Sequence, residues 1–395
     1  MVHHTPLSLL LILLVGLAIA RLSAGTLARW AVPVILVELL VGFVLGNTVL
    51  PFREVAPLTG LTELGVLSLF FQVGLEVRGD LLASQRRPLM RLVAISALAP
   101  FLFAWPLQRL FSLSQPTAVL CLAVLCATGT GVTLRVLAQR QALQTPSGRL
   151  LVGVSVLDDL PAISLLALAT ALGAKVSGGD HGPFSWLGPL LGVLLGLLSL
   201  LAVDAWARHR PERPASPLGI LMVLTISAWV GETVGLTSLF GAFWGGVLMA
   251  RLSPADAQLR PSVQPVLALL SDVFLPLYFI SVGMRVEALT LLRPEAWAMA
   301  SVLVAMALFS KLACAFGVTD RERAAGVDRR LVVYGLIPRG LPGLVFASTA
   351  LRAGVVSPVQ FSALVLMVTF TTVVGLLLLE RRLQRLGLPA AGGSP

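Results

Sequence analysis

The chain has 395 residues, of which 57% are hydrophobic and only 12% are charged, and its mean hydropathy is +0.92. Soluble domains carry roughly 25% charged residues, so this composition excludes an ordinary soluble protein. The formal net charge of +10 suggests nucleic-acid binding at first sight, and the distribution of the basic residues tests that interpretation.

Charged residues and Pro/Gly-rich stretches divide the chain into thirteen apolar segments. Most of them reach the roughly 20 residues that a membrane-spanning helix needs. In chain order the segments are 5–20, 31–50, 57–77, 89–111, 116–138, 149–173, 184–206, 216–234, 236–250, 264–284, 295–317, 330–351 and 357–379. We therefore predict an all-α polytopic membrane protein with thirteen transmembrane helices.

The basic residues alternate between successive loops. Loops after odd-numbered segments, together with the C-terminal tail, hold 21 Lys and Arg, whereas loops after even-numbered segments hold 6. This is the positive-inside pattern. It predicts a multi-pass protein of the cell membrane (the inner membrane of a bacterium) with its N-terminus outside and its C-terminus in the cytoplasm. The net positive charge therefore reflects the orientation of the chain in the lipid bilayer, and we expect no nucleic-acid partner.

Two short motifs recur seven segments apart. Leu69–Val77 in segment 3 is similar to Tyr278–Val286 in segment 10, and Leu40–Gly46 in segment 2 is similar to Leu239–Gly245 in segment 9. Because seven is odd, the second copy would cross the membrane in the opposite sense, as in transporters built from inverted repeats.

The same offset relates two segments that contain helix breakers. Segment 5 includes Ala127–Thr133, with two glycines, and segment 12 includes Ile337–Gly343, with two prolines and two glycines. Unpaired backbone at this depth is tolerated where it is buried or lines a cavity. Paired interruptions in matching repeat positions point to a transport site. We predict two broken helices that form it.

Segment 6 carries two adjacent carboxylates near its middle, Asp158 and Asp159. No other ionisable residue occurs between Arg149 and Lys175. A charge at this depth costs roughly 2.5–3.5 kcal/mol on insertion scales, so such residues usually have a function. The pair indicates an ion or proton site inside a membrane protein.

The chemistry of exchange follows from these residue types. A buried carboxylate can hold a proton near neutral pH. Without its proton it is a hard oxygen ligand for a small cation, helped by the hydroxyls of Thr128 and Thr130 and by carbonyls freed at the break. Competition between proton and cation for one charge is sufficient for obligatory exchange. An intramembrane aspartyl protease needs aspartates that converge from different helices, so we predict that the protein is not an enzyme.

Several motifs resemble the monovalent cation/proton antiporter family. Thr128–Leu137 resembles its unwound helix and is followed, as in that family, by Val154–Asp159. Further matches are Pro33–Glu38 with Gly42 and Gly46, Ser281–Met284 and Pro338–Gly340, so that the similarity runs from about Pro33 to Val374. The resemblance implies a six-helix core from about 89–173 and 295–379 and a scaffold from about 5–77 and 184–284. It also implies a homodimer and no cofactor.

The Asp-Asp pair is similar to the electrogenic sodium/proton branch of that family. The resemblance implies that Asp159 binds Na⁺ (or Li⁺) and the proton, that Asp158 assists as its neighbour, and that Lys311 pairs with Asp158. An ammonium that snorkels to the interface is the other interpretation of Lys311. Two other functions stay open: a potassium/proton antiporter and a sodium-coupled symporter for organic anions.

Two further charged residues lie inside apolar segments. Arg339, beside the second break, is expected to offset half-helix dipoles and hold structure, and Glu38 is expected to have a structural or dipole-compensating role. The family often has Glu-Val after Pro-Arg-Gly, whereas this chain has Leu341-Pro342. The resemblance therefore does not predict which group neutralises the positive charge of Arg339.

Overall fold

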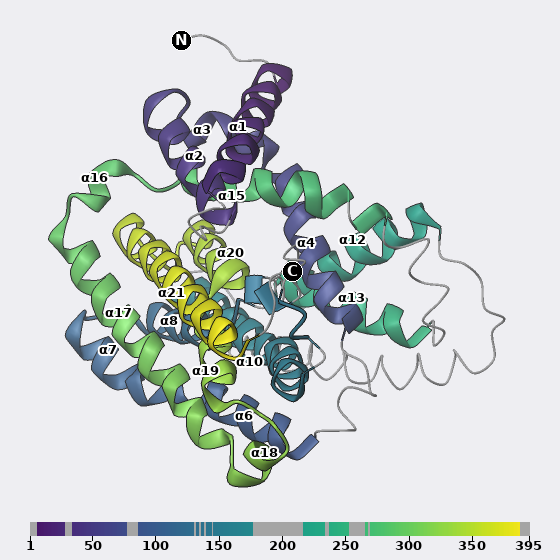
Figure 1. The fold of residues 1–395 in the computed structure, drawn as a ribbon. Helices are drawn as coiled ribbons and strands as arrows, with labels where there is room; N and C mark the ends of the chain where they lie inside the picture. The colour runs from purple at the N-terminus through teal and green to yellow at the C-terminus, as the bar shows by residue number, and fades with distance from the viewer. Residues whose placement is uncertain are drawn as a thin grey trace. The chain divides into compact units, whose positions relative to one another are not determined.

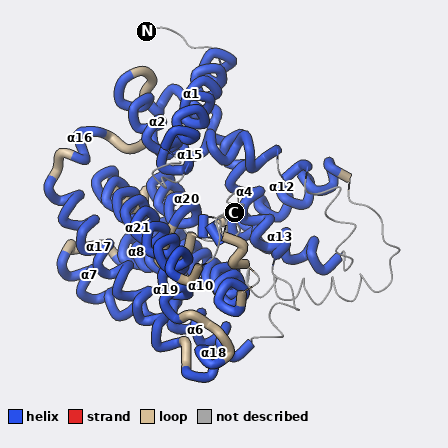
Figure 2. Tube along the Cα trace, viewed as in Figure 1, coloured by secondary structure: helices blue, strands red, loops and turns tan. Residues whose placement is uncertain are grey.

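In a computed structural model, the described residues are 6–27, 34–76, 86–129, 132–133, 136–137, 140–143, 145–176, 216–233, 237–252, 265–267 and 269–387. All regular elements in this part of the chain are helices (Figure 2). Among the same residues, 7 helices are long and apolar enough to cross a membrane. The composition explains this: in hydrocarbon, a helix pairs its own backbone groups.

The chain divides into two compact units, which we describe separately. Unit 1 comprises Met1–Leu22, Glu38–Arg78 and Thr170–Arg285, and unit 2 comprises Ser23–Val37, Gly79–Ala169 and Val286–Pro395.

Unit 1 is built from apolar helices, whose α labels appear in Figure 1, and from short helical turns. They are α1 (Pro6–Leu27) and α2 (Val34–Thr48), which both lie largely in this unit, α3 (Phe52–Val55), η2 (Ala56–Leu58), α4 (Thr59–Glu76), α12 (Pro217–Thr233), α13 (Ser238–Leu252), the π-helical turn η4 (Leu270–Phe274) and α15 (Leu275–Met284). Leu9 and Leu13 of α1 pack in one cluster with Leu277 and Ile280 of α15.

Glycines allow two helix pairs in unit 1 to approach backbone to backbone. A Cβ on Gly42 of α2 would lie 2.0 Å from the carbonyl oxygen of Ile280, and one on Gly283 of α15 would lie 2.2 Å from that of Leu39. Any side chain at these positions would force the helices apart.

The same reciprocal contact joins α4 and α13. A Cβ on Gly74 would lie 2.0 Å from the carbonyl oxygen of Phe243, and one on Gly246 would lie 2.0 Å from that of Phe71. Gly74 and Gly283, which the sequence match pairs, both make such a contact. In α13 the contact with α4 is made by Gly246, which lies one residue after the motif Leu239–Gly245.

Unit 2 contains the remaining helices. They are α6 (Arg86–Leu98), η3 (Ala99–Phe103), α7 (Ala104–Leu110), α8 (Gln115–Cys126), most of α10 (Pro146–Val176), α16 (Ala288–Leu291), α17 (Pro294–Leu312), η5 (Ala313–Gly317), α18 (Asp320–Ala324), α19 (Arg329–Leu336), α20 (Gly340–Arg352) and α21 (Pro358–Arg385). Buried leucines of α6, α10, α19 and α21 form its apolar core, including Leu92, Leu151, Leu336 and Leu379.

The two predicted interruptions are present and meet. Helix α8 ends at Cys126, and α19 and α20 are separated between Leu336 and Gly340. The N–H of Gly129 donates to the carbonyl oxygen of Pro338 at 2.5 Å. Gly340 has a φ of +46°, and a Cβ there would lie 3.0 Å from the Cα of Gly129. Glycine is therefore required on both sides of the crossing.

The seventh predicted segment, 184–206, lies outside the described residues. Within the described residues, each of the other predicted segments overlaps one helix or consecutive helices. Segment 4 is one example, since a 3₁₀ turn with Pro100 joins α6 to α7. The count of thirteen stays a prediction.

Candidate functional site

Asp158 and Asp159 lie in the middle of α10, in unit 2, and are 2% and 1% exposed. Successive residues of a helix point about 100° apart, so the two carboxylates face different neighbours. Pro161 lies inside the same helix. Because proline has no N–H, the carbonyl of Leu157 loses its usual donor in the helix. The aspartates therefore sit where α10 is itself locally weakened.

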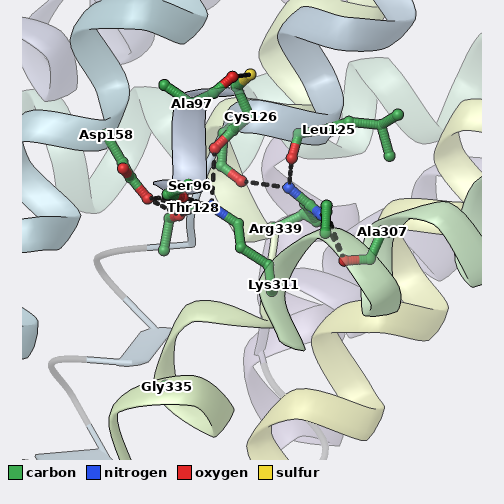
Figure 3. Close-up of polar contacts among 12 residues, drawn as sticks. Ser96, Ala97, Leu125, Cys126, Thr128, Asp158, Ala307, Lys311, Gly335 and Arg339 are labelled. Carbon is green, nitrogen blue, oxygen red and sulfur yellow. Dashed lines mark hydrogen bonds and ion pairs between the residues drawn. The ribbon is translucent and has the colours of Figure 1, made fainter. Parts of the chain in front are cut away.

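One oxygen of Asp158 receives three donors from three different elements (Figure 3). Its Oδ2 accepts hydrogen bonds from Ser96 Oγ of α6 at 2.6 Å, from Thr128 Oγ1 at the first break at 2.9 Å, and from Lys311 Nζ of α17 at 3.0 Å. The last contact is an ion pair in which both side chains are almost completely buried, at 0% and 1% exposure.

Lys311 is held by oxygen atoms only among its described contacts. Its ammonium donates to the carbonyl oxygen of Cys126 and to Thr128 Oγ1, both at 3.0 Å, and to Ser96 Oγ, in addition to Asp158. A buried charge is tolerated when it is paired and hydrogen-bonded in this way. Since Lys311 is 0% exposed, it does not snorkel to a membrane surface.

Arg339 binds the end of the other broken helix. Its Nη1 donates to the carbonyl oxygens of Leu125 and of Ala127, the latter at 3.0 Å, and its Nη2 donates to the carbonyl oxygen of Ala307 at 3.0 Å and to Ser310 Oγ at 3.4 Å. Figure 3 shows the guanidinium directed at Leu125 and Ala307.

These contacts account for three consecutive carbonyls at the C-terminal end of α8. Arg339 donates hydrogen bonds to the carbonyl oxygens of Leu125 and Ala127, and Lys311 donates one to the carbonyl oxygen of Cys126. The last carbonyls of a helix lack intrahelical donors and carry its negative dipole end, which cations stabilise. Leu341, at the position where the resemblance implied a glutamate, is buried. In the described part of the chain, Arg339 is thus compensated by backbone dipoles.

The buried charges of unit 2 balance within the described residues. They are Asp158, Asp159, Lys311 and Arg339, two carboxylates and two cations. The cluster is neutral when both carboxylates are ionised. Addition of one proton or one monovalent cation then gives the same local charge, so the two can replace each other.

Some of the residues that the sequence predicted for the site do not belong to the charged cluster of described residues. Thr130 lies outside the described residues, although Thr128 is inside the cluster. Glu38 is 3% exposed on α2 and belongs to unit 1. Ser96 was missed by the sequence reasoning. A single serine in an apolar segment has no distinctive spacing, and its position is set by how α6 packs.

A helical membrane protein in which two interrupted helices meet beside buried carboxylates and cations has the architecture of a secondary ion transporter. Comparison with known proteins agrees. The family model described as "Sodium/hydrogen exchanger, transmembrane" matches residues 9–381. The chain belongs to this sodium/hydrogen exchanger family, whose members are transporters and not enzymes.

The individual relatives have low sequence identity to this chain, but their alignments cover most of it. The chain is 27% identical over 327 residues to the high-affinity Na⁺/H⁺ antiporter NhaS3 of Synechocystis, covering 80% of this chain and 69% of the relative. It is 25% identical over 366 residues to the Na⁺/H⁺-K⁺ antiporter GerN of Bacillus cereus, covering 90% and 91%.

A solved structure shares the fold. The sodium proton antiporter MjNhaP1 of Methanocaldococcus jannaschii superposes with a TM-score of 0.68 at 17% identity, covering 98% of this chain and 99% of that one. The likeness establishes an all-helical fold with many apolar helices.

Proposed function

We propose that this protein is a secondary active antiporter that exchanges Na⁺ or Li⁺ for H⁺ across a membrane. The observation that carries the proposal is the buried Asp158–Asp159 pair beside the crossing of two broken helices. Relatives named as Na⁺/H⁺ antiporters support it. The transported ions are substrates, and no cofactor is needed for exchange.

The two aspartates have different roles in this proposal. Asp159 binds the cation or the proton, and Asp158 assists while Lys311 holds it by one oxygen. Thr128 and Thr130 help to line the site. Arg339 holds the break together through backbone carbonyls, and Glu38 supports the helix packing of unit 1. Na⁺ would be held by Asp159 and Asp158.

We propose that unit 2 is the transport core, expected at 89–173 and 295–379, and that unit 1 is the scaffold, expected at 5–77 and 184–284. Gly79–Ala169 and Val286–Pro395 of unit 2 overlap the expected core, whereas Ser23–Val37 of unit 2 lies in the part expected to be scaffold. The cluster around Asp158 lies entirely in unit 2, which supports this division. We propose that the scaffold forms a homodimer, by analogy with related antiporters.

The proposed inverted repeat is supported by the glycine contacts of unit 1. If α2 corresponds to α13 and α4 to α15, then the pair α2–α15 must correspond to the pair α13–α4. Both pairs have reciprocal glycine-to-carbonyl contacts, at Gly42 and Gly283 in one and at Gly246 and Gly74 in the other. A repeat related by an axis in the membrane plane produces this equivalence.

Contacts between helix ends support the proposed thirteen-helix topology. Residues at loops that follow odd-numbered segments contact each other: Arg91 with Glu322, Arg140 with Glu380, and Arg382 with Asp328. Residues at loops that follow even-numbered segments do the same: Thr117 with Val355 and Thr290 with Ser362. Loops on one side of a membrane can meet, and loops on opposite sides cannot. The basic side is the proposed cytoplasmic side, with the C-terminus, and the N-terminus lies outside.

The experiment that tests the function uses purified protein in liposomes that contain a pH-sensitive dye. Addition of Na⁺ or Li⁺ outside should drive proton movement in the opposite direction. The name of GerN includes K⁺, so K⁺ is tested separately, and a K⁺ response without a Na⁺ response would replace the proposal by K⁺/H⁺ exchange. Sodium uptake that requires an organic anion and moves no protons would indicate a symporter.

We propose further that exchange is electrogenic, with more protons than cations moved in each turnover. The ion pair between Lys311 and Asp158 supports a second proton-accepting group beside Asp159. The test is the same flux measured with and without a potential set by valinomycin and K⁺. Exchange at equal rates under both conditions would refute electrogenicity and leave the antiport itself intact.

A further inference from the structure

We propose that unit 2 carries a binding site for an anionic phospholipid of the surrounding bilayer, at the membrane end where η5 leads through α18 into α19 (Figure 1). The inference goes beyond the proposed antiport, because the ligand is a lipid and not a transported ion. The site combines an exposed apolar ridge with three arginines. The ridge consists of Phe309, Leu312 and Phe316, and the arginines are Arg321, Arg329 and Arg330.

The apolar ridge runs along the last turns of the span Pro294–Gly317, which is formed by α17 and η5. Phe309 is 64%, Leu312 45% and Phe316 79% exposed. Spacings of three and four residues place side chains on one face of a helix. Lys311 of the same helix points into the buried charged cluster instead. An exposed apolar face of this kind marks a membrane contact, so the ridge offers a surface for an acyl chain.

Arg329 lies at the end of the ridge. Its Cζ is 5.9 Å from the centre of the Phe316 ring, and α19, which begins at Arg329, contacts η5. The span Pro294–Gly317 ends one residue after Phe316, and the span Arg329–Arg352 begins at Arg329. Both side chains therefore lie at the depth of lipid headgroups. A guanidinium over an aromatic ring keeps N–H donors at its edge, and these match phosphate oxygens.

The loop between the two spans has more positive charge than its own carboxylates neutralise. Each carboxylate of this loop has an arginine partner: Asp320 with Arg323, Glu322 with Arg91, and Asp328 with Arg382. Within the described residues, three arginines of the same loop have no carboxylate partner: Arg321, Arg329 and Arg330. Arginines near a membrane surface attract anionic lipids. The uncompensated charge beside the apolar ridge therefore favours an anionic phospholipid over a neutral or zwitterionic one.

A second arginine–aromatic pair in unit 2 provides a comparison. Arg109 Cζ is 5.8 Å from the centre of the Trp105 ring, which belongs to an exposed side chain near the end of the span Arg87–Leu110. Arg109 is the only Lys or Arg between Arg91 and Arg135. A single cation with an aromatic neighbour fits general anchoring at the membrane interface, so this pair is the matched control.

The test measures lipid binding by the purified full-length protein in detergent. The protein is mixed with equal amounts of phosphatidylglycerol and phosphatidylcholine that have the same acyl chains. The lipids that stay bound after gel filtration are then quantified by mass spectrometry. We expect wild type to retain phosphatidylglycerol preferentially.

The variants test the arginines and the ridge separately. Arg329→Gln should lower the preference for phosphatidylglycerol about fivefold, and the triple change at Arg321, Arg329 and Arg330 to Gln should remove it. Phe316→Ala should reduce the amount of phosphatidylglycerol retained, because it removes part of the ridge and the ring beneath Arg329. Arg109→Gln should behave as wild type.

Each other outcome would overturn the inference. Examples are equal retention of the two lipids by wild type, an unchanged preference in the triple variant, and an equal loss in Arg109→Gln. Displacement of the lipid by glycerol phosphate, which lacks acyl chains, would indicate a site for free phosphate groups. A change from dimer to monomer in Phe316→Ala, with the lipid preference kept, would indicate that a second copy of the chain covers the ridge.

Two features keep the test decisive. If the triple variant is not recovered folded, the double change at the exposed residues Arg321 and Arg330 to Gln decides, and an unchanged preference there would overturn the inference. Because lipid retention is measured without ion flux, failure of the proposed antiport would leave this result intact, and failure of lipid binding would leave the antiport intact.

Discussion

At the scale of single residues, the site is a balance of four buried charges. Asp158, Asp159, Lys311 and Arg339 sum to zero when both carboxylates are ionised. Arg339 is engaged with backbone carbonyls, whereas Lys311 is paired with Asp158.

Asp159→Asn should abolish exchange. The amide keeps the size of the side chain but can neither bind a proton in this pH range nor attract a cation as a carboxylate does. We expect Na⁺-driven proton flux to fall to the level of protein-free liposomes, while the elution profile in detergent stays that of wild type. Flux at near wild-type rate would show that Asp159 does not bind the transported ions.

Lys311→Gln should weaken exchange and alter its response to voltage and pH. Loss of the opposite charge 3.0 Å from Asp158 leaves that buried carboxylate without its cationic partner, so the rate of exchange should fall. If only Asp159 then changes its charge during the cycle, transport becomes electroneutral and its pH profile changes. In wild type, each net charge moved gains about 2.3 kcal/mol per 100 mV.

The measurement for Lys311→Gln is flux with and without a valinomycin-set potential across a pH series. An unchanged pH profile together with an unchanged voltage response would mean that Lys311 has only a packing role.

At the scale of elements, the crossing of the two breaks positions the site. It joins the end of α8 to the start of α20 through the bond from Gly129 to Pro338, and α21 supports it from the side. Thr372 Oγ1 accepts the N–H of Gly340 at 3.0 Å, and a Cβ on Gly375 would lie 2.6 Å from the ring of Pro338. The crossing is therefore tightly packed on both sides.

Gly129→Ala should separate the two breaks. The new Cβ would lie 2.9 Å from the nitrogen of Gly340 and 3.0 Å from the carbonyl oxygen of Pro338. Because these neighbours are backbone atoms, they cannot move as a flexible side chain could, and we expect a loss of about 1–3 kcal/mol in stability together with reduced exchange.

Thermal unfolding in detergent and flux in liposomes would measure both effects. Gly60→Ala on α4 is the control, because a Cβ there meets nothing within 4 Å. If Gly129→Ala unfolds at the same temperature as Gly60→Ala and transports normally, the close contact between the breaks is not needed for stability or transport.

At the scale of the whole molecule, the testable property is orientation. Short epitope tags placed before Met1 and after Pro395 should be labelled from opposite sides of the membrane in intact cells and inverted vesicles. The tag after Pro395 should be accessible from the cytoplasmic side, because the 21 basic residues of the odd loops and tail favour that side. Labelling of both tags from one side would require an even number of spans and would contradict the inverted repeat.

The sequence by itself determined the class of the protein, its interrupted segments and its central carboxylates. These features are local: hydrophobic length, helix-breaking residues and charge in an apolar segment each have their own physical consequence. The breaks at Thr128–Gly129 and Pro338–Gly340 and the family were predicted correctly for this reason.

The tertiary structure alone decided which groups meet. It brought Ser96 to Asp158, gave Arg339 three carbonyl partners, and placed Gly246 of α13 against the backbone of α4. Each depends on the rotation and register of one packed helix against another. An apolar pattern alone does not determine the rotation or the register of a helix. Both are set only when side chains and backbones from distant segments come into contact.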